Sequence, residues 1–166
     1  GEQRLEKMVS GRYMGELFGM ALAELLGTKE HMHAFTSVDI SRILEDVNGD
    51  AQSAASIVET ATGQMLSVED AVCVRELART IVVRSVRLIA ATFVGTLWQI
   101  TGEGEIRPQH IAVDGSVYEK MPLVKETMAD VFAELLGEDA PKVDTILASC
   151  GSGLGAALAA AMVERG

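Results

Sequence analysis

The sequence predicts a helix-rich α/β protein in which several helices precede a β-α-β-α unit with two parallel strands. Two short apolar runs, at 109–113 and 143–148, are each followed by a turn and then by an amphipathic or alanine-rich segment. A strand–helix–strand connection within one sheet is a right-handed crossover, so the two strands must be parallel. We therefore treat the 166 residues as a single fragment with a helical part (1–105) and a βαβα part (106–166).

Apolar spacing over residues 5–26 predicts the first helix, with Gly27 as its stop. Gly11 and Gly15 fall inside this segment. Glycine within a helix costs about 1 kcal/mol relative to alanine. We expect either close packing or a ligand to explain these two glycines.

Two shorter helices should follow. Thr36 or Ser37 is placed to cap the first of them, which the Asn48-Gly49 turn ends. Asp50 is expected to cap the next helix, which Gly63 closes.

The longest periodic segment follows a capping sequence that starts at Ser67. If the helix is unbroken to Ile100, it is about 50 Å long at 1.5 Å per residue. Four arginines crowd part of its remaining surface, and we interpret them as a solvated or domain-facing surface: Arg75, Arg79, Arg84 and Arg87.

Composition excludes several classes of protein. The formal net charge of −10 argues against a nucleic-acid surface, which needs clustered lysine and arginine. The most apolar run, 88–98, is too short to span a bilayer, and no signal peptide is visible, so we expect no membrane partner and a cytoplasmic location. Cys73 and Cys150 are expected to be buried free thiols in a reducing compartment.

His31 and His33 form an H-x-H pattern without an acidic or cysteine partner at helical spacing. Two imidazoles alone do not complete a typical metal site. We therefore predict no metal site in the chain.

The glycine-rich stretch 151–155 joins the second strand to the last helix. Such a turn leaves backbone N–H groups free at a positive helix end and lets a phosphate or ribose approach the main chain. A tight strand–helix corner with close packing explains the same residues equally well. The G-x-G-x-x-A spacing also fits a Rossmann fingerprint, but no further strand follows the helix to complete that unit.

Both predicted strands end at the same edge of their sheet, because they are parallel. Asp114-Gly115-Ser116 and Gly151-Ser152-Gly153 should therefore meet at the carboxyl end, where ligands bind in open α/β sheets. Two strands make a poor sheet for so many helices and leave both edges exposed. We expect the sequence, which starts at Gly1 without Met, to be half of a domain from a longer protein.

Three motifs in one register support that expectation. The segments 5–17 (LEKMVSGRYMGEL), 113–120 (VDGSVYEK, with Pro122 after it) and 151–157 (GSGLGAA) occur with matching order and spacing from the start to the end of the chain. Together they resemble the hexokinase family. The resemblance implies the C-terminal part of the large domain of a ribonuclease-H-like, actin-like ATPase fold, which clasps a sugar between two domains and holds ATP mainly on the large one.

The resemblance also assigns roles to individual residues. Glu6 matches a carboxylate that hydrogen-bonds sugar hydroxyls, and Gln3 matches a neighbour in that pocket. The positions that match nucleotide contacts are Gly11, Arg12, Ser37, Ser41, Asp114, Gly115, Ser116, Gly151, Ser152, Gly153, Leu154, Gly155 and Ala156. The implied substrates are ATP, with Mg²⁺ carried in on the nucleotide and no protein ligand for the metal, and a hexose phosphorylated on its 6-hydroxyl.

The chain departs from the family pattern in two ways. Leu154 stands where many members have Lys or Arg, so a phosphate-facing charge is missing. The Asp-Leu-Gly-Gly-Thr loop, the Gly-Thr-Gly loop and the Asn-Asp-Thr segment with the catalytic aspartate are absent. We therefore expect no catalytic residue here, no activity of the chain alone, and a missing N-terminal half as its partner. The alternative is a non-catalytic nucleotide-binding or structural module derived from the same fold.

Overall fold

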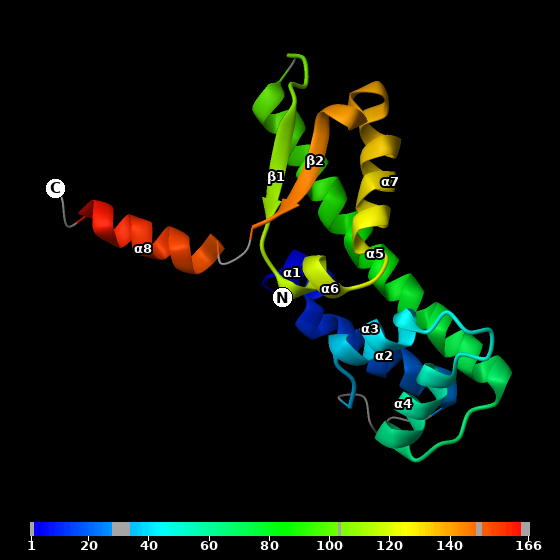
Figure 1. Cartoon of the computed structure of the whole chain (residues 1–166). Helices are drawn as coiled ribbons and strands as arrows, with labels where there is room; N and C mark the ends of the chain where they lie inside the picture. Colours follow the sequence, from blue (N-terminus) through cyan, green and yellow to red (C-terminus); the bar gives the residue numbers. More distant parts are fainter. Residues whose placement is uncertain (1, 28–33, 103, 149–150, 164–166) are drawn as a thin grey trace.

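A computed structural model describes residues 2–27, 34–102, 104–148 and 151–163 (Figure 1). The elements run in the following order: α1 (Arg4–Val9), α2 (Gly11–Leu26), α3 (Ser37–Glu45), α4 (Gln52–Thr62), α5 (Val68–Thr101), β1 (Gln109–Val113), α6 (Ser116–Lys120), α7 (Val124–Leu136), the 3₁₀ helix η1 (Gly137–Lys142), β2 (Val143–Leu147) and α8 (Gly151–Val163). The prediction of a helix-rich α/β protein is confirmed.

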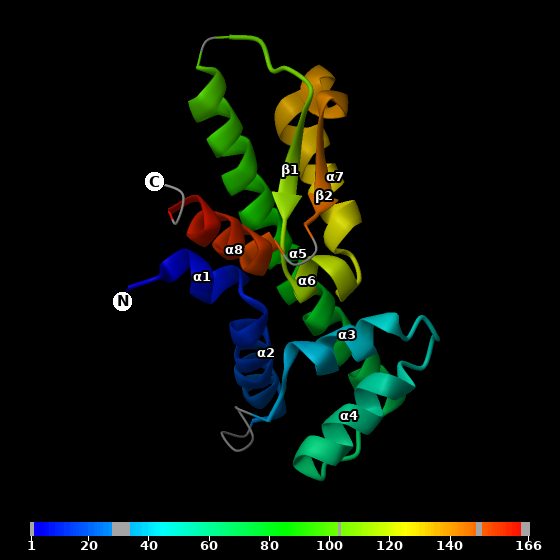
Figure 2. The same cartoon turned by 60° about the vertical axis from the view of Figure 1, so that its left-hand side comes forward.

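Helix α5 is the central element of the fold. Its 34 residues span about 51 Å, as predicted, and the Ser67 side chain caps its start by accepting a hydrogen bond from the Asp70 amide. Figures 1 and 2 show β1, β2 and α7 beside one half of this helix and α2, α3 and α4 beside the other. Ten of its side chains are buried, so α5 joins both halves into one hydrophobic core.

By length and composition alone, α5 could also cross a membrane. The prediction that the most apolar segment is too short to span a bilayer considered residues 88–98 alone. By length and composition it is wrong, because the apolar character extends over a longer window of α5. Within the fold, α5 packs against α1, α2, α3, α4 and α7. This packing accounts for its ten buried residues, whereas Val68, Trp98 and Ile100 of the same helix are exposed.

Strands β1 and β2 are parallel and pair from Gln109 with Val143 to Val113 with Leu147. The predicted crossover and parallel pairing are thus confirmed. Residues on the outer face are exposed, and there His110 contacts Asp144 directly across the ladder. No third strand extends the sheet among the described residues.

The predicted helix over 5–26 is broken into α1 and α2. Ser10 between them has extended backbone angles (φ −72°, ψ 138°). Gly11 therefore begins α2 and does not bear the cost of an interior glycine. Gly15 is buried, and a Cβ on it would lie 2.4 Å from the Phe35 carbonyl oxygen, so close packing explains this glycine.

The first of the two shorter helices is capped as expected. The Thr36 side chain accepts a hydrogen bond from the Asp39 amide, and the Asp39 carboxylate accepts one from the Thr36 amide at 2.8 Å. The prediction that Asp50 caps the next helix is wrong. Instead, Asp46 accepts a hydrogen bond from the Ser53 amide at 2.8 Å, because the chain turns back and places the start of α4 beside the end of α3.

Two boundaries in the βαβα part differ from the predictions. The sequence pattern predicts that Pro122 begins the helix between the two strands, but α7 begins after Leu123, because Leu123 adopts a left-handed conformation (φ 69°). The glycine stretch is helical from Gly151 onward and does not form a separate loop before α8.

Two side-chain expectations are also settled. The Cys73 thiol is free but exposed on α5, not buried, while Cys150 lies outside the described residues, as do His31 and His33.

Of the four arginines, Arg75 donates to backbone carbonyls of the α3–α4 turn, and Arg87 forms an ion pair with Glu134 of α7.

Candidate functional site

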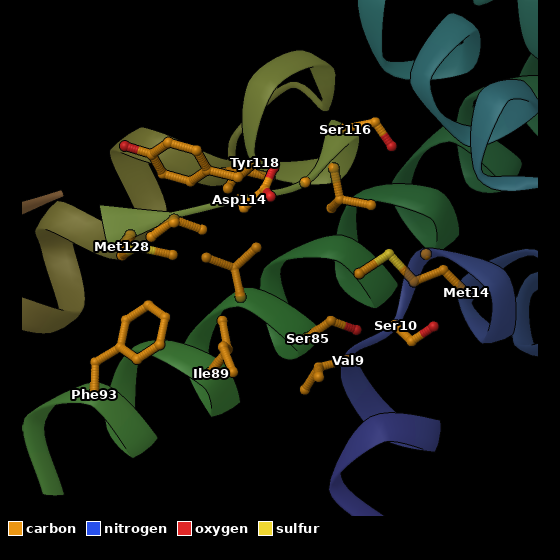
Figure 3. A pocket seen from close by; sticks show the side chains of 16 residues that line it. Val9, Ser10, Met14, Ser85, Ile89, Phe93, Asp114, Ser116, Tyr118 and Met128 are labelled. Carbon is orange, nitrogen blue, oxygen red and sulfur yellow. The ribbon is translucent and has the colours of Figure 1, made fainter. Parts of the chain in front are cut away.

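A cavity of about 440 Å³ lies at the carboxyl end of β1. Figure 3 shows Val9, Ser10 and Met14 from the α1–α2 junction facing Ser85, Ile89 and Phe93 of α5, with Asp114 and Ser116 at the strand end. Most of the lining is apolar, and polar side chains come from Ser10, Ser85, Asp114, Ser116 and Tyr118.

A second cavity of about 260 Å³ lies on the other side of α6. It is lined by α3 and α6 and is more polar, with Ser37, Ser41, Arg42, Glu45 and Lys120 around it. Ser116 and Val117 line both cavities. The two cavities therefore adjoin where β1 passes into α6.

Three segments that are distant in sequence meet at this junction. A Cβ built on Gly11 would lie 2.6 Å from Val117 Cγ2 and 3.5 Å from Ser37 Oγ. The starts of α2, α3 and α6 are therefore in van der Waals contact. Gly11 permits this approach, so packing within the chain, and not a ligand alone, accounts for the residue.

The structure brings together several of the predicted nucleotide residues. Gly11, Asp114, Gly115 and Ser116 line the first cavity, and Ser37, Ser41 and Ser116 line the second. Within this group, the Ser41 hydroxyl donates a 3.0 Å hydrogen bond to Glu45, which leaves its oxygen able to accept.

Other predicted residues do not line either cavity. Glu6 and Gln3 are exposed on and beside α1, and Arg12 is exposed over the ring of Tyr13, with 5.8 Å between its guanidinium carbon and the ring centroid. Glu6 lies within α1 and Gln3 is its N-cap, and their role at a sugar site stays a prediction.

The predicted glycine site forms the first turns of α8. Gly153, Gly155 and Ala156 are exposed, and a Cβ on either glycine would meet no atom within 4 Å. The surroundings of Gly151, Ser152 and Leu154 lie outside the described side chains. The strands that precede the two segments end side by side, because the Ala148 amide donates to the Val113 carbonyl at 2.9 Å. The meeting of Asp114-Gly115-Ser116 with Gly151-Ser152-Gly153 itself stays a prediction, since no residue of the glycine stretch lines either cavity among the described residues.

Some residues of the site carried no usable sequence signal. Ser85 and Tyr118 line the first cavity. Ser85 sits at an apolar-face position of α5, as an ordinary core residue would, and Tyr118 falls within the 113–120 motif but had no role assigned to it. Arg42 and Lys120 place two positive charges around the second cavity. Their proximity depends on how α3 packs beside α6, which periodicity does not reveal.

No cluster of three or more His, Cys, Asp or Glu side chains suited to a metal ion occurs in the described part of the chain.

Comparison with known proteins identifies the family. Residues 1–162 match the family model described as hexokinase. The chain is 36% identical to hexokinase-1 of Oryza sativa subsp. japonica, with 97% of this chain and 36% of that protein aligned. It is 33% identical to hexokinase-2 of Rattus norvegicus, with 99% of this chain and 19% of that protein aligned.

A solved structure described as a crystal structure of hexokinase has the same fold. The TM-score is 0.72 at 23% identity, over 89% of this chain and 34% of that one. The chain thus has the fold of actin-like sugar kinases, and it belongs to the hexokinase family, a family of kinases. It spans about a third of the length of the plant relatives that it matches.

Proposed function

We propose that this chain is the nucleotide-binding portion of an ATP-dependent hexokinase. One observation carries the proposal: six predicted nucleotide residues from three distant segments line two adjoining cavities. These residues are Gly11, Ser37, Ser41, Asp114, Gly115 and Ser116. Serine hydroxyls can donate to or accept from ribose and phosphate oxygens, and Arg42 and Lys120 add positive charge at the second cavity, which the Glu45 carboxylate also lines.

The parent enzyme would transfer the γ-phosphoryl group of ATP to the 6-hydroxyl of glucose or another hexose, the reaction that begins glycolysis. Glu6 and Gln3 would accept and donate hydrogen bonds to the sugar from the exposed face of α1. Mg²⁺ would arrive on the nucleotide. We further propose that the parent is cytoplasmic.

We propose that the isolated chain is inactive. Phosphoryl transfer needs a base for the sugar hydroxyl and groups that position and neutralise the γ-phosphate. The sequence holds neither the Asn-Asp-Thr segment nor the two phosphate loops. These parts would belong to a missing N-terminal half.

Calorimetry with MgADP and the 166-residue chain tests the proposal directly. We expect saturable binding that Ser116→Ala weakens by about fivefold, since one hydrogen bond contributes about 1 kcal/mol. Thr92→Ala, on the exposed face of α5, is the matched control and should bind like the unsubstituted chain. The absence of binding would contradict a nucleotide site in the isolated chain, and hexose phosphorylation by the chain would contradict its inactivity.

The sugar site requires the parent enzyme. Glu6→Ala should raise the KM for the hexose by an order of magnitude or more, because a charged hydrogen bond to a sugar hydroxyl is lost. The KM for ATP should stay unchanged. An unchanged hexose KM would remove Glu6 from the site.

The alternative function, a non-catalytic nucleotide-binding or structural module, is favoured by one observation. Helix α8 exposes Leu158 (57%) and Met162 (76%), and the two-strand sheet ends in open edges within the described residues. Size-exclusion chromatography distinguishes the cases. A structural piece should self-associate alone and become a defined complex when an N-terminal hexokinase half is co-expressed, whereas a self-sufficient nucleotide-binding module should remain monomeric.

A further inference from the structure

Tyr118 joins α6 to the neighbouring strand. Its side chain is buried, and its hydroxyl lies 3.0 Å from the carbonyl oxygen and 2.8 Å from the hydroxyl of Thr145 on β2. The phenol proton can go to the carbonyl while the Thr145 hydroxyl donates to the phenol oxygen, so both contacts can be hydrogen bonds at once. The Lys125 ammonium lies over the ring at 5.4 Å from its centroid.

Helix α6 depends on such contacts for its orientation. It has only five residues, and a helix that short has little stability of its own. It begins at Ser116, directly after Gly115, whose φ of 144° only glycine adopts readily. The backbone of this turn therefore has unusual conformational freedom in the unfolded chain, and tertiary contacts must hold it in place.

The position of α6 determines the shape of the candidate site. Ser116 and Val117 line both cavities, and Val117 also lies against Gly11 at the start of α2. In Figure 3 the Tyr118 ring extends away from Ser116. Tyr118 also lines the first cavity, and its hydroxyl reaches Thr145 on β2, so one residue links the cavity wall to the strand.

We propose that Tyr118 is a positioning residue, whose hydrogen bonds to Thr145 hold Ser116 and Val117 at the junction of the two cavities. This inference rests on the proposed function, in which Ser116 contacts an adenine nucleotide. The Tyr118 hydroxyl is engaged with Thr145, so its proposed role is to hold the turn. It acts through the turn that it fixes to β2.

The decisive variant is Tyr118→Phe, which keeps the ring and removes the hydroxyl. We expect amide hydrogen exchange in 114–121 to accelerate by about fivefold, the effect of one or two net hydrogen bonds, while exchange in α5 and α7 stays unchanged. The Kd for MgADP should rise by a similar factor. Tyr13→Phe is the matched control, since the Tyr13 hydroxyl has no hydrogen-bond partner in the described part of the chain.

The Thr145 side of the contact gives a second test. Thr145→Ser keeps the hydroxyl and should behave like the unsubstituted chain, whereas Thr145→Val should accelerate exchange in 114–121 and add little once Tyr118→Phe is present. Unchanged exchange in 114–121, or equal acceleration throughout the fold, would overturn the inference. A failure of the unsubstituted chain to bind MgADP would instead overturn the proposed function, and the exchange data would still decide the role of Tyr118.

Discussion

The hydroxyl of Ser85 on α5 donates a hydrogen bond to the carbonyl oxygen of Met8, 2.9 Å away in the last turn of α1. Ser85 is only 1% exposed, and its hydroxyl also lies 2.8 Å from the Ile81 carbonyl oxygen. The helix breaks at Ser10, so the Met8 carbonyl lacks the backbone donor that a continuous helix would provide. Ser85 thereby fixes α1, which bears Glu6, beside the first cavity.

Ser85→Ala should lower the free energy of unfolding by about 1–3 kcal/mol, because it leaves the Met8 carbonyl without this donor. Urea denaturation measures the change. Thr92→Ala is the control: Thr92 bonds only within α5, to the Leu88 carbonyl, and its replacement should not lower stability. Equal stability of the Ser85 variant and the unsubstituted chain would show that the contact is not energetically important.

Gly15→Ala should destabilise the fold by about 3 kcal/mol or more. The new methyl group would lie 2.4 Å from the Phe35 carbonyl oxygen and 2.7 Å from Thr36 Cα, so backbone must move to admit it. Gly95→Ala makes the same change at an exposed site on α5 where no atom lies within 4 Å. It should stabilise the chain by about 0.5–1 kcal/mol, and thermal denaturation of the two variants compares them directly.

The ion pair between Arg87 and Glu134 should make stability depend on pH. The hydrogen bonds from Arg87 lower the pKa of Glu134 below its ordinary value of 4.5. A lowered folded-state pKa contributes stability above the unfolded value, and this contribution is lost as the pH falls through the folded value. Urea midpoints should therefore differ between the unsubstituted chain and Glu134→Gln at neutral pH and converge below about pH 4.5.

Glu76→Gln serves as the control for this titration, since Glu76 is on the same long helix and has no ion-pair partner in the described ranges. Its urea midpoint measures the effect of removing one carboxylate from α5 without breaking an ion pair. If the urea midpoints of Glu134→Gln and the unsubstituted chain differed by the same amount at every pH, the assigned role of the ion pair would be contradicted.

Asp46 and Asp50 should differ in their importance for α4. The amides of Ser53 and Asn48 donate to Asp46 and hold its pKa below the ordinary value, whereas the Asp50 carboxylate accepts only from the side chain of Gln52 among the described residues. Asp46→Ala should lower the melting temperature clearly, and Asp50→Ala should change it little. A larger effect at Asp50 would restore the capping role that sequence spacing favoured.

Local patterns predicted much of the fold. Apolar periodicity located α5, and the crossover rule required parallel strands before any register was known. Such features are predictable because they depend on neighbouring residues and on chain geometry. The break at Ser10 was not predictable from local sequence. The Met8 carbonyl beside the break is bonded by Ser85, which lies on another helix.

For the candidate site, too, some features follow from the sequence and others only from the tertiary structure. By itself, the sequence determined that the chain belongs with actin-like sugar kinases and that it lacks the phosphate loops, and it predicted which residues would contact a nucleotide. Only the tertiary structure decided that Gly11, Ser37 and Ser116 meet around α6, because that meeting depends on packing between segments remote in sequence. Side-chain packing and hydrogen bonds such as Tyr118–Thr145 fix these distances, and no local pattern encodes them.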